Sequence, residues 1–236
     1  MKGKLLSVRL EAVAALVPKA QLLVDIGSDH AYLPVALVER HWVQRAICGE
    51  VAQGPWESSH REIEKMALTK QIDVRLGDGL DILSPADRVE VVTIAGMGGL
   101  LIRDILNRAA KKGFFSVQKP TLVLQANNHR EDLRYWLARH AYAITDERLV
   151  RDRGKYYVVL QAKPTPKPYS LGDEEALFGS HIDIQQPQLA KAYYEHLAKC
   201  TEKIISSLRQ SQRPSKMEEF LHHLEILKAR IKQLEE

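Results

Sequence analysis

A short turn in this sequence carries acidic residues at positions where nucleotide-binding turns usually carry glycines. The segment reads DIGSDHAYLP, from Asp25 to Pro34, and follows the apolar run at residues 22–24. In an open parallel sheet, ligands bind where the first strand ends and its helix begins. Gly27 keeps the tight turn, but Asp29 stands where the second glycine of a dinucleotide fingerprint would lie. A carboxylate there repels a pyrophosphate, so the turn favours a ligand that has no phosphate.

The same acids suit a cationic cofactor. S-adenosylmethionine carries a sulfonium and an α-ammonium group, which Asp25 and Asp29 can face, while backbone N–H groups of the turn can bind its carboxylate. Two further acids, Glu50 and Asp78, close the next two expected strands. Glu50 can accept hydrogen bonds from ribose hydroxyls, and Asp78 can accept them from the amino group of adenine. This order of acids favours S-adenosylmethionine over NAD, and ordinary turn chemistry is the alternative explanation.

These acidic residues can form one site only if a sheet brings the ends of their strands side by side. Short runs rich in Val, Ile and Leu alternate with segments of helical spacing, which predicts a βαβ order and a parallel sheet covered on both faces. After residue 141, two strands joined by a turn at Arg153-Gly154 predict an antiparallel hairpin. The expected fold class is α/β, with a mostly parallel seven-stranded sheet. The five expected parallel strands are residues 22–27, 45–51, 73–78, 89–96 and 121–126.

The C-terminal part has a different pattern. The segment PTPKP, Pro164 to Pro168, breaks regular structure, so we expect one domain at residues 1–162 and a second at 163–236. Apolar residues recur at three- and four-residue steps on both sides of Pro214, which predicts a helical coiled-coil hairpin. The first arm, Pro187 to Lys216, is basic. It either contacts phosphates or presents a solvated face.

The composition narrows the possible partners. Lys and Arg total 34 against 30 Asp and Glu, with a pI near 9.0, which permits a nucleic-acid partner without requiring one. Cys48 and Cys200 lack metal-ligand spacing, so we expect reduced thiols, no metal and a cytoplasmic location. No apolar run approaches the ~20 residues that cross a bilayer, so we expect no membrane partner. A monomer is the expected state.

Two further motifs close the fourth and fifth expected strands. The segment TIAGMGG, Thr93 to Gly99, has three glycines that let the backbone approach a ligand. The segment LQANN, Leu124 to Asn128, offers amide side chains for a nucleobase edge. From Arg103 to Lys155, twelve Lys or Arg stand against six Asp or Glu, which favours contact with RNA phosphates.

Together these motifs resemble the bacterial tRNA adenine-22 N1-methyltransferases. The resemblance covers roughly residues 5 to 160 and rests on DIGSDHAYLP, GEV.GP, VRLGDGL, TIAGMGG and LQ.N followed by LR.WL. It implies a class I (Rossmann-like) methyltransferase domain that uses S-adenosyl-L-methionine, releases S-adenosyl-L-homocysteine and methylates N1 of adenine 22 in tRNA. The family's coiled-coil C-terminal domain fits the predicted hairpin. A methyltransferase for another RNA or DNA position is the first alternative. An NAD-dependent oxidoreductase and an RNA-binding adaptor are less favoured, because of Asp29 and of the intact acids respectively.

The resemblance also implies site residues. It places Asp25, Gly27, Ser28, Asp29, His30 and Leu33 at the methionine end of the cofactor, Glu50 and Val51 at its ribose and adenine, Asp78 and Gly79 at the adenine edge, and Ala95, Gly96 and Met97 towards the target base. The expected tRNA-contacting residues are Arg9, Tyr32, Arg130, Arg134 and Arg153, with Tyr32 able to stack on a flipped base.

The expected catalytic residues are Asp29, His30 and Asn127. Neutral adenine N1 carries a lone pair, so the attack needs no prior deprotonation, and positioning and electrostatics can supply most of the acceleration. Asp29 would stabilise the cationic product, and His30 would orient the base or relay a proton. One departure from the family is Ala126, which replaces the proline of Leu-Gln-Pro-Asn and predicts a freer loop at Asn127.

Overall fold

The computed structural model describes residues 6–182, 186–210 and 214–235. The chain divides into two compact units, Met1–Leu177 and Phe178–Glu236. This division falls beyond the predicted boundary at residue 162, because the segment after the last strand stays bound to the first unit. Tyr135 donates a hydrogen bond to Asp173 over 2.6 Å, and Tyr169 donates one to the carbonyl of Tyr142 over 3.2 Å.

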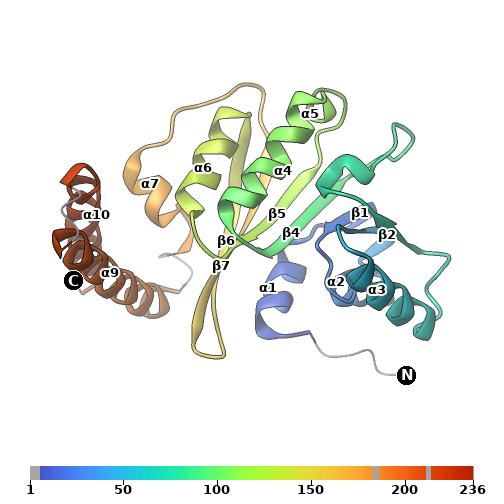
Figure 1. Ribbon diagram of the computed structural model, residues 1–236, viewed down its shortest axis with the longest axis horizontal. Coiled ribbons are helices and arrows are strands. Elements are labelled where there is room, and N and C mark those ends of the chain that lie inside the picture. Colours follow the sequence, from blue (N-terminus) through green and yellow to red (C-terminus); the bar gives the residue numbers. More distant parts are fainter. Residues whose placement is uncertain (1–5, 183–185, 211–213, 236) are drawn as a thin grey trace. The chain divides into compact units, whose positions relative to one another are not determined.

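A seven-stranded sheet forms the centre of the first unit, as the sequence predicts, with the strand order β3-β2-β1-β4-β5-β7-β6 (Figure 1). Strands β1 to β5 are parallel, and β7 pairs antiparallel with β5 and β6. The hairpin turns at Arg153 and Gly154, both with positive φ, which confirms the predicted turn. The strands are β1 (Ala20–Ile26), β2 (Val43–Glu50), β3 (Ile72–Leu76), β4 (Val91–Met97), β5 (Thr121–Ala126), β6 (Tyr142–Asp152) and β7 (Lys155–Pro164).

Helices cover both faces of this sheet, so its central strands are buried on both sides. Along β1, Leu23 packs into one apolar cluster with α1, α2 and α3, while Val24 packs into the opposite cluster with α4 and α6. This explains why the sequence of β1 is a continuous apolar run rather than an alternating one. The helices of this unit are α1 (Val8–Leu16), α2 (Tyr32–Glu39), α3 (Gln53–Lys65), the 3-10 turn η1 (Gly79–Ile82), α4 (Gly99–Lys111), α5 (Phe114–Val117) and α6 (Arg130–Arg139).

The topology fixes where a ligand can bind. The strand order runs outward in both directions from β1 and β4, and α2 and α4, which follow these two strands, lie on opposite faces. At such a switch point the two connections diverge, which leaves a crevice beyond the carboxyl ends of the strands. The turn after Asp25 and the glycine-rich segment after Thr93 both lie at this crevice.

The second unit contains two long helices, α9 (Pro187–Gln210) and α10 (Pro214–Gln233), which follow the short helix α7 (Asp173–Phe178). They pack against each other antiparallel, since Lys191 pairs with Glu235 at 2.9 Å and Lys228 pairs with Glu202 at 3.0 Å. The structure therefore shows a helical hairpin, while coiled-coil packing stays a prediction. Among the described residues, no helix combines the length and apolar character needed to cross a membrane.

Candidate functional site

A polar hollow of about 330 Å³ lies at the crevice between β1 and β4. It brings together ten of the residues that the sequence predicts for the site. Eight are predicted cofactor residues, and Arg9 and Tyr32 are predicted tRNA contacts. The hollow is lined by Arg9, Leu10, Asp25, Gly27, Ser28, Asp29, Tyr32, Leu33, Ala95, Gly96 and Met97.

Asp25 is the buried anion of the polar hollow. It is 4% exposed at the end of β1, and the hydroxyls of Ser28 and Thr93 each donate to its carboxylate over 2.5 Å. Burial raises the pKa of Asp25, while the two hydroxyl hydrogen bonds and the nearby Arg9 charge act in the opposite direction. A buried carboxylate held in this way favours a cationic ligand group, because a cation would offset the desolvation of its charge.

The turn after Asp25 adopts a conformation that side chains rarely take. Asp29, His30 and Ala31 have φ values of 41°, 74° and 55°, which lie in the left-handed region. Each such residue costs about 1 kcal/mol or more, so the surroundings must hold the turn in place. Glu50, at the end of β2, does so by accepting a hydrogen bond from the Asp29 backbone N–H over 2.9 Å.

Glu50 therefore has a structural role that the sequence did not reveal. It is 4% exposed, and its Oε1 atom also accepts a hydrogen bond from the Ser59 hydroxyl over 3.2 Å. Burial raises the pKa of Glu50, and these hydrogen bonds oppose that shift. Glu50 is not among the residues that line the polar hollow, and its contact with a ribose stays a prediction.

The side chains of Asp29 and His30 lie at the rim of the polar hollow. The Asp29 side chain is 87% exposed and that of His30 is 46% exposed, with 3.7 Å between the carboxylate and imidazole Nε2. The His30 ring stacks on the Tyr32 ring, at 5.3 Å between centroids. Water screens an exposed carboxylate, so Asp29 stabilises a nearby cation more weakly than a buried residue would. The catalytic roles of Asp29 and His30 stay predictions.

The residues predicted for the adenine edge lie outside the lining of the polar hollow. Asp78 follows β3, and Arg108 of α4 donates to both of its oxygens, at 2.5 and 2.7 Å. This hydrogen bonding lowers the pKa of Asp78. Val51 is 73% exposed, and Gly79 has a φ of 59°. Arg108 is a neighbour that the sequence did not indicate, because 30 residues separate it from Asp78.

Asn127 is exposed but hydrogen-bonded to its neighbours through its backbone and its side chain. Its backbone N–H bonds the carbonyl of Met97 over 2.8 Å, and its side-chain nitrogen bonds the carbonyl of Gly96 over 2.8 Å. Its side-chain oxygen accepts from Gln125 over 3.0 Å. Ala126 is 2% exposed and stays paired with Met97 in the sheet. Hydrogen bonds therefore join Asn127 to β4 and to Gln125, and the freer loop expected from Ala126 stays a prediction.

The prediction that Arg134 contacts tRNA is wrong. Its side chain is 1% exposed and pairs with the buried carboxylate of Glu147 at 2.6 Å. The same guanidinium donates to the carbonyl of Ala176 over 2.8 Å. Leu133 and Leu137 lie on the same inward face of α6, so the helix turns Arg134 into the unit. Its role is to bind the segment after β7 to the first unit.

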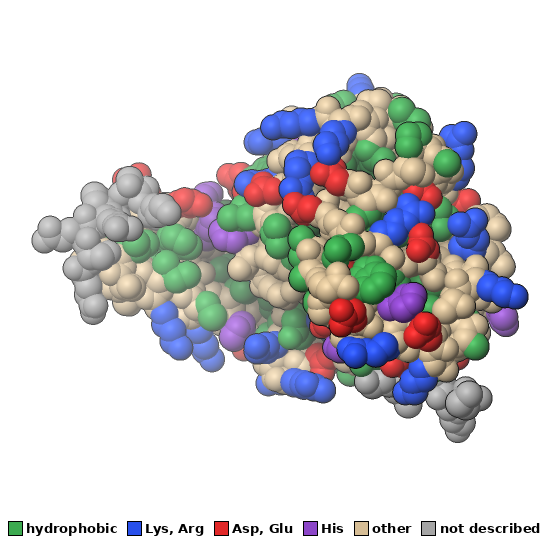
Figure 2. All heavy atoms as spheres, turned by 45° about the vertical axis from the view of Figure 1, so that its right-hand side comes forward, with side chains coloured by type: hydrophobic (Ala, Val, Ile, Leu, Met, Phe, Trp, Pro, Cys, Tyr) green, Lys and Arg blue, Asp and Glu red, His purple; other side chains and the backbone are tan. Residues whose placement is uncertain are grey.

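The other predicted tRNA-contacting residues differ in exposure. Arg153 is exposed at the hairpin turn, and Arg130 is partly exposed. Arg9 is partly exposed and lines the polar hollow. On the face that Figure 2 shows, Lys and Arg side chains occupy several places with Asp and Glu between them, rather than one basic patch.

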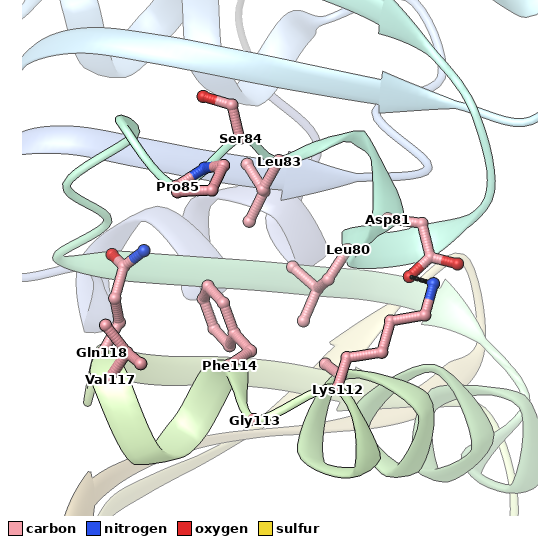
Figure 3. Close-up of a pocket in the computed structure, with 11 residues that line it drawn as sticks. Leu80, Asp81, Leu83, Ser84, Pro85, Lys112, Gly113, Phe114, Val117 and Gln118 are labelled. Carbon is pink, nitrogen blue, oxygen red and sulfur yellow. Dashed lines mark ion pairs between the residues drawn. The ribbon is translucent and has the colours of Figure 1, made fainter.

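A second hollow of about 340 Å³, the apolar hollow, lies between the segment after η1 and the end of α4. Figure 3 shows Leu80, Leu83 and Phe114 directed into it from both sides. Its charged groups, Asp81 and Lys112, form an ion pair at 2.8 Å. None of the predicted site residues lines the apolar hollow.

One group of side chains in the described part of the chain has spacing that a metal ion could use. It consists of His129, Glu131 and Asp132, none of which is buried. Asp132 already pairs with Arg103 at 3.3 Å and with His129 at 3.3 Å. Exposed acidic groups of this kind are common without a metal, so we assign no function to them.

The seven-stranded sheet with an acidic turn at its switch point defines a Rossmann-like methyltransferase fold. A family model described as tRNA (adenine(22)-N(1))-methyltransferase matches residues 23–229. The chain belongs to this family, as the resemblance of its motifs indicated.

Individual relatives agree with this assignment. The chain is 36% identical to a Bacillus subtilis protein named tRNA (adenine(22)-N(1))-methyltransferase, over 94% of this chain and 95% of that protein. A Streptococcus pneumoniae structure described as a putative tRNA (m1A22) methyltransferase with S-adenosyl-L-methionine is 33% identical, with a TM-score of 0.84 over 96% of this chain and all of that chain. A Mycoplasma capricolum relative in complex with S-adenosyl-homocysteine is 27% identical, with a TM-score of 0.82 over 97% of this chain and 99% of that chain.

Proposed function

We propose that this protein transfers a methyl group from S-adenosyl-L-methionine to N1 of adenine 22 in tRNA. The observation that carries the proposal is the buried carboxylate of Asp25 in a polar hollow at the sheet's switch point. Membership of the tRNA (adenine(22)-N(1))-methyltransferase family supports the choice of acceptor. Methyl transfer to another RNA or DNA position is the alternative, because the cofactor half of such domains is shared among acceptors.

The residues present fit this cofactor. Gly27 and Gly96 both have positive φ and line the polar hollow. The absence of a Cβ leaves room there for the side chains of Met97 and Arg9, which line the same hollow. Asp25 would bind the α-ammonium group, and Glu50 would accept from the ribose. Asp78, held by Arg108, would bind the adenine edge. When bound, the cofactor supplies a methyl group on a sulfonium.

The rest of the chemistry is positioning. Adenine N1 needs no general base, so the protein has to hold the base in line and exclude water. Tyr32, which lines the polar hollow and stacks on the His30 ring, would stack on an extruded base. Asn127 lies beside Gly96, on the side of the polar hollow where β4 and β5 end. Arg130 and Arg153 would contact phosphates.

The proposal also covers the location of the protein, its oligomeric state and the packing of its C-terminal helices. We place the protein in the cytoplasm as a monomer, where its tRNA substrate is present, and we assign a coiled-coil packing to α9 and α10. The lysines and arginines of α9 would add a phosphate-contacting surface. Asp29 and His30 would act at the rim, with Asp29 favouring the cationic product.

The test is methyl transfer with a radiolabelled donor to two unmodified tRNA transcripts, one with adenine and one with guanine at position 22. We expect label only in the adenine transcript, and reverse transcription should stop at that position because N1 methylation blocks pairing. Label in both transcripts would favour the alternative acceptor. No label in either would refute the proposed reaction.

A further inference from the structure

The end of β4 contains an irregularity that serves the acceptor side of the site. The pairing of β4 with β5 shifts register between Ala95 and Met97, which leaves Gly96 as a bulged residue with a φ of 83°. Bulges remove backbone groups from the regular ladder and commonly lie beside functional sites. The N–H and C=O of Gly96 are here bound by side chains from β5 and the residue after it.

Those side chains close a ring of hydrogen bonds. The Gly96 N–H donates to Gln125 Oε1 over 3.1 Å, and Gln125 Nε2 donates to Asn127 Oδ1 over 3.0 Å. Asn127 Nδ2 then donates to the Gly96 carbonyl over 2.8 Å, which returns the ring to the residue where it began. Arg9 adds a fourth bond, from its Nη1 to Gln125 Oε1 over 3.0 Å.

The donors and acceptors of this ring have fixed directions. A guanidinium and a backbone N–H can only donate, so the atom of Gln125 that faces Arg9 and Gly96 has to be its oxygen. The Gln125 nitrogen must then face Asn127, which presents its own oxygen. A backbone carbonyl can only accept, so the Asn127 nitrogen faces Gly96. If either amide group were rotated by half a turn, two hydrogen-bond donors or two acceptors would face each other.

Gln125 is the buried centre of the arrangement. Its side chain is 0% exposed, and its two amide atoms bond Arg9 and Gly96 on one side and Asn127 on the other. Arg9 lines the polar hollow, and a Cβ on Gly96 would lie 3.3 Å from its Nη1 atom. The glycine therefore lets Arg9 approach, and Gln125 keeps it beside the cofactor side of the site.

We propose that Gln125 is a positioning residue that fixes the direction of the Asn127 amide towards the acceptor base while holding Arg9 in the polar hollow. The inference rests on the proposed methyl transfer. Once the ring is closed, Asn127 retains one N–H and one lone pair for the base, and their direction is set by Gln125. Gln125 itself does not touch the base.

The first test replaces Gln125 with glutamate, which keeps its size and its acceptor for Arg9. The new carboxylate cannot donate to Asn127, so the ring opens on the acceptor side only. We expect kcat on the adenine-22 transcript to fall by about 10- to 100-fold. The Kd for S-adenosylhomocysteine should stay within about threefold, and Tm within a few degrees.

The matched control is Gln161→Met. Gln161 is a second glutamine of the same sheet and is only partly buried. Its side chain bonds Leu16 and Thr145 rather than the ring. Its loss should lower Tm with little change in kcat. If Gln125→Glu kept kcat within about twofold, or if Gln161→Met lost as much kcat as Gln125→Glu, the positioning role would be wrong.

A second pair of variants uses exposed positions, which avoids any question of folding. Asn127→Asp places an oxygen against the Gly96 carbonyl and opens the same ring. Asn128→Asp adds the same charge one residue away, where the side-chain oxygen only accepts, from the Gly99 N–H over 3.2 Å. We expect Asn127→Asp to lower kcat about as much as Gln125→Glu, and Asn128→Asp, which leaves the ring closed, to lower kcat clearly less.

The double variant Gln125→Glu/Asn127→Asp then measures whether the two substitutions affect kcat independently. If the ring acts as a unit, the double variant loses no more kcat than either single variant. Fully additive losses would overturn the inference. Wild-type protein is measured first: absence of transfer there would refute the proposed function, whereas an active wild type with additive variants would refute only the role of Gln125.

Discussion

Two hollows of the first unit, the polar hollow and the apolar hollow, have nearly equal volumes of about 330 and 340 Å³ but differ in their lining residues. The polar hollow is lined by the buried Asp25 carboxylate and by the turns at Gly27 and Gly96. The apolar hollow is walled by leucines and a phenylalanine, and its two charges neutralise each other. Volume alone does not separate them. A ligand site is marked by polar groups that the fold has taken from water and left facing open space.

The largest expected effect of a substitution is at Asp25. Asp25→Asn keeps the shape of the side chain but removes its charge. One of the two hydroxyls, Ser28 or Thr93, then has to accept from the new amide nitrogen instead of donating to an oxygen. Loss of a charged hydrogen bond of about 2–3 kcal/mol should raise the Kd for S-adenosylhomocysteine by about 30- to 150-fold. Isothermal titration calorimetry measures this directly. If the folded variant bound S-adenosylhomocysteine with an unchanged Kd, the polar hollow would not be the cofactor site.

Phe114→Ala makes the opposite test in the apolar hollow. Phe114 packs edge-on against Phe115 at 5.0 Å between ring centroids. We expect a loss of about 2 kcal/mol in the free energy of unfolding, because the side chain is only partly buried. Urea denaturation gives this value. The Kd for S-adenosylhomocysteine should not change, and a tenfold weaker Kd would mean that the two hollows are not independent.

One part of the wall of the apolar hollow should respond to pH, because Ser84, which lines it, donates hydrogen bonds to Asp87 from its backbone N–H and its hydroxyl. Arg75 donates to both oxygens of Asp87 and to the carbonyl of Ile82, and this pairing lowers the pKa of Asp87 to about 2. An unfolded aspartate has a pKa of about 3.9, so the pair contributes stability above that pH and loses it as pH falls towards 2. Asp87→Asn should cost about 1–2 kcal/mol at pH 7.

Urea denaturation of the Asp87→Asn variant and the wild type between about pH 7 and pH 2 measures this difference. The two stabilities should converge as pH approaches 2. A constant gap across that range would mean that the wall is held by packing rather than by the ion pair.

The smallest expected effect is at the rim of the apolar hollow. Lys112→Met breaks the ion pair with Asp81. The side chain of Lys112 is 62% exposed and that of Asp81 is 32% exposed. Exposed ion pairs contribute about 0–1 kcal/mol, so Tm should change by no more than a few degrees. Methyl-transfer kinetics should match wild type. A large loss of activity would assign the apolar hollow a function that its chemistry does not indicate.

The sequence predicted the parts of the site that depend on residue type at a strand end. Asp25 and Gly27 are recognisable because a buried parallel strand is a continuous apolar run, and the turn after it has a known ligand-binding position. The seven strands and the hairpin turn followed from the same patterns. For this reason the fold and the location of the polar hollow were predictable before the structure.

Contacts between distant residues were not predictable. Arg134 was assigned to the surface by its charge, but its buried partner Glu147 lies on a strand and no local pattern joins them. Its position between Leu133 and Leu137 on α6 was the one available signal. Likewise, the sequence indicated Gln125 only as one of the amide side chains of LQANN. Its bond to Gly96 was not predictable, because the bulge is visible only in the pairing of β4 with β5.

The most direct test of the account is a crystal structure of the protein with S-adenosylhomocysteine. The account predicts one molecule in the polar hollow, with its ammonium group at Asp25 and its ribose at Glu50, and no molecule beside Phe114. Binding in the apolar hollow, or an amino-acid end directed away from Asp25, would contradict it.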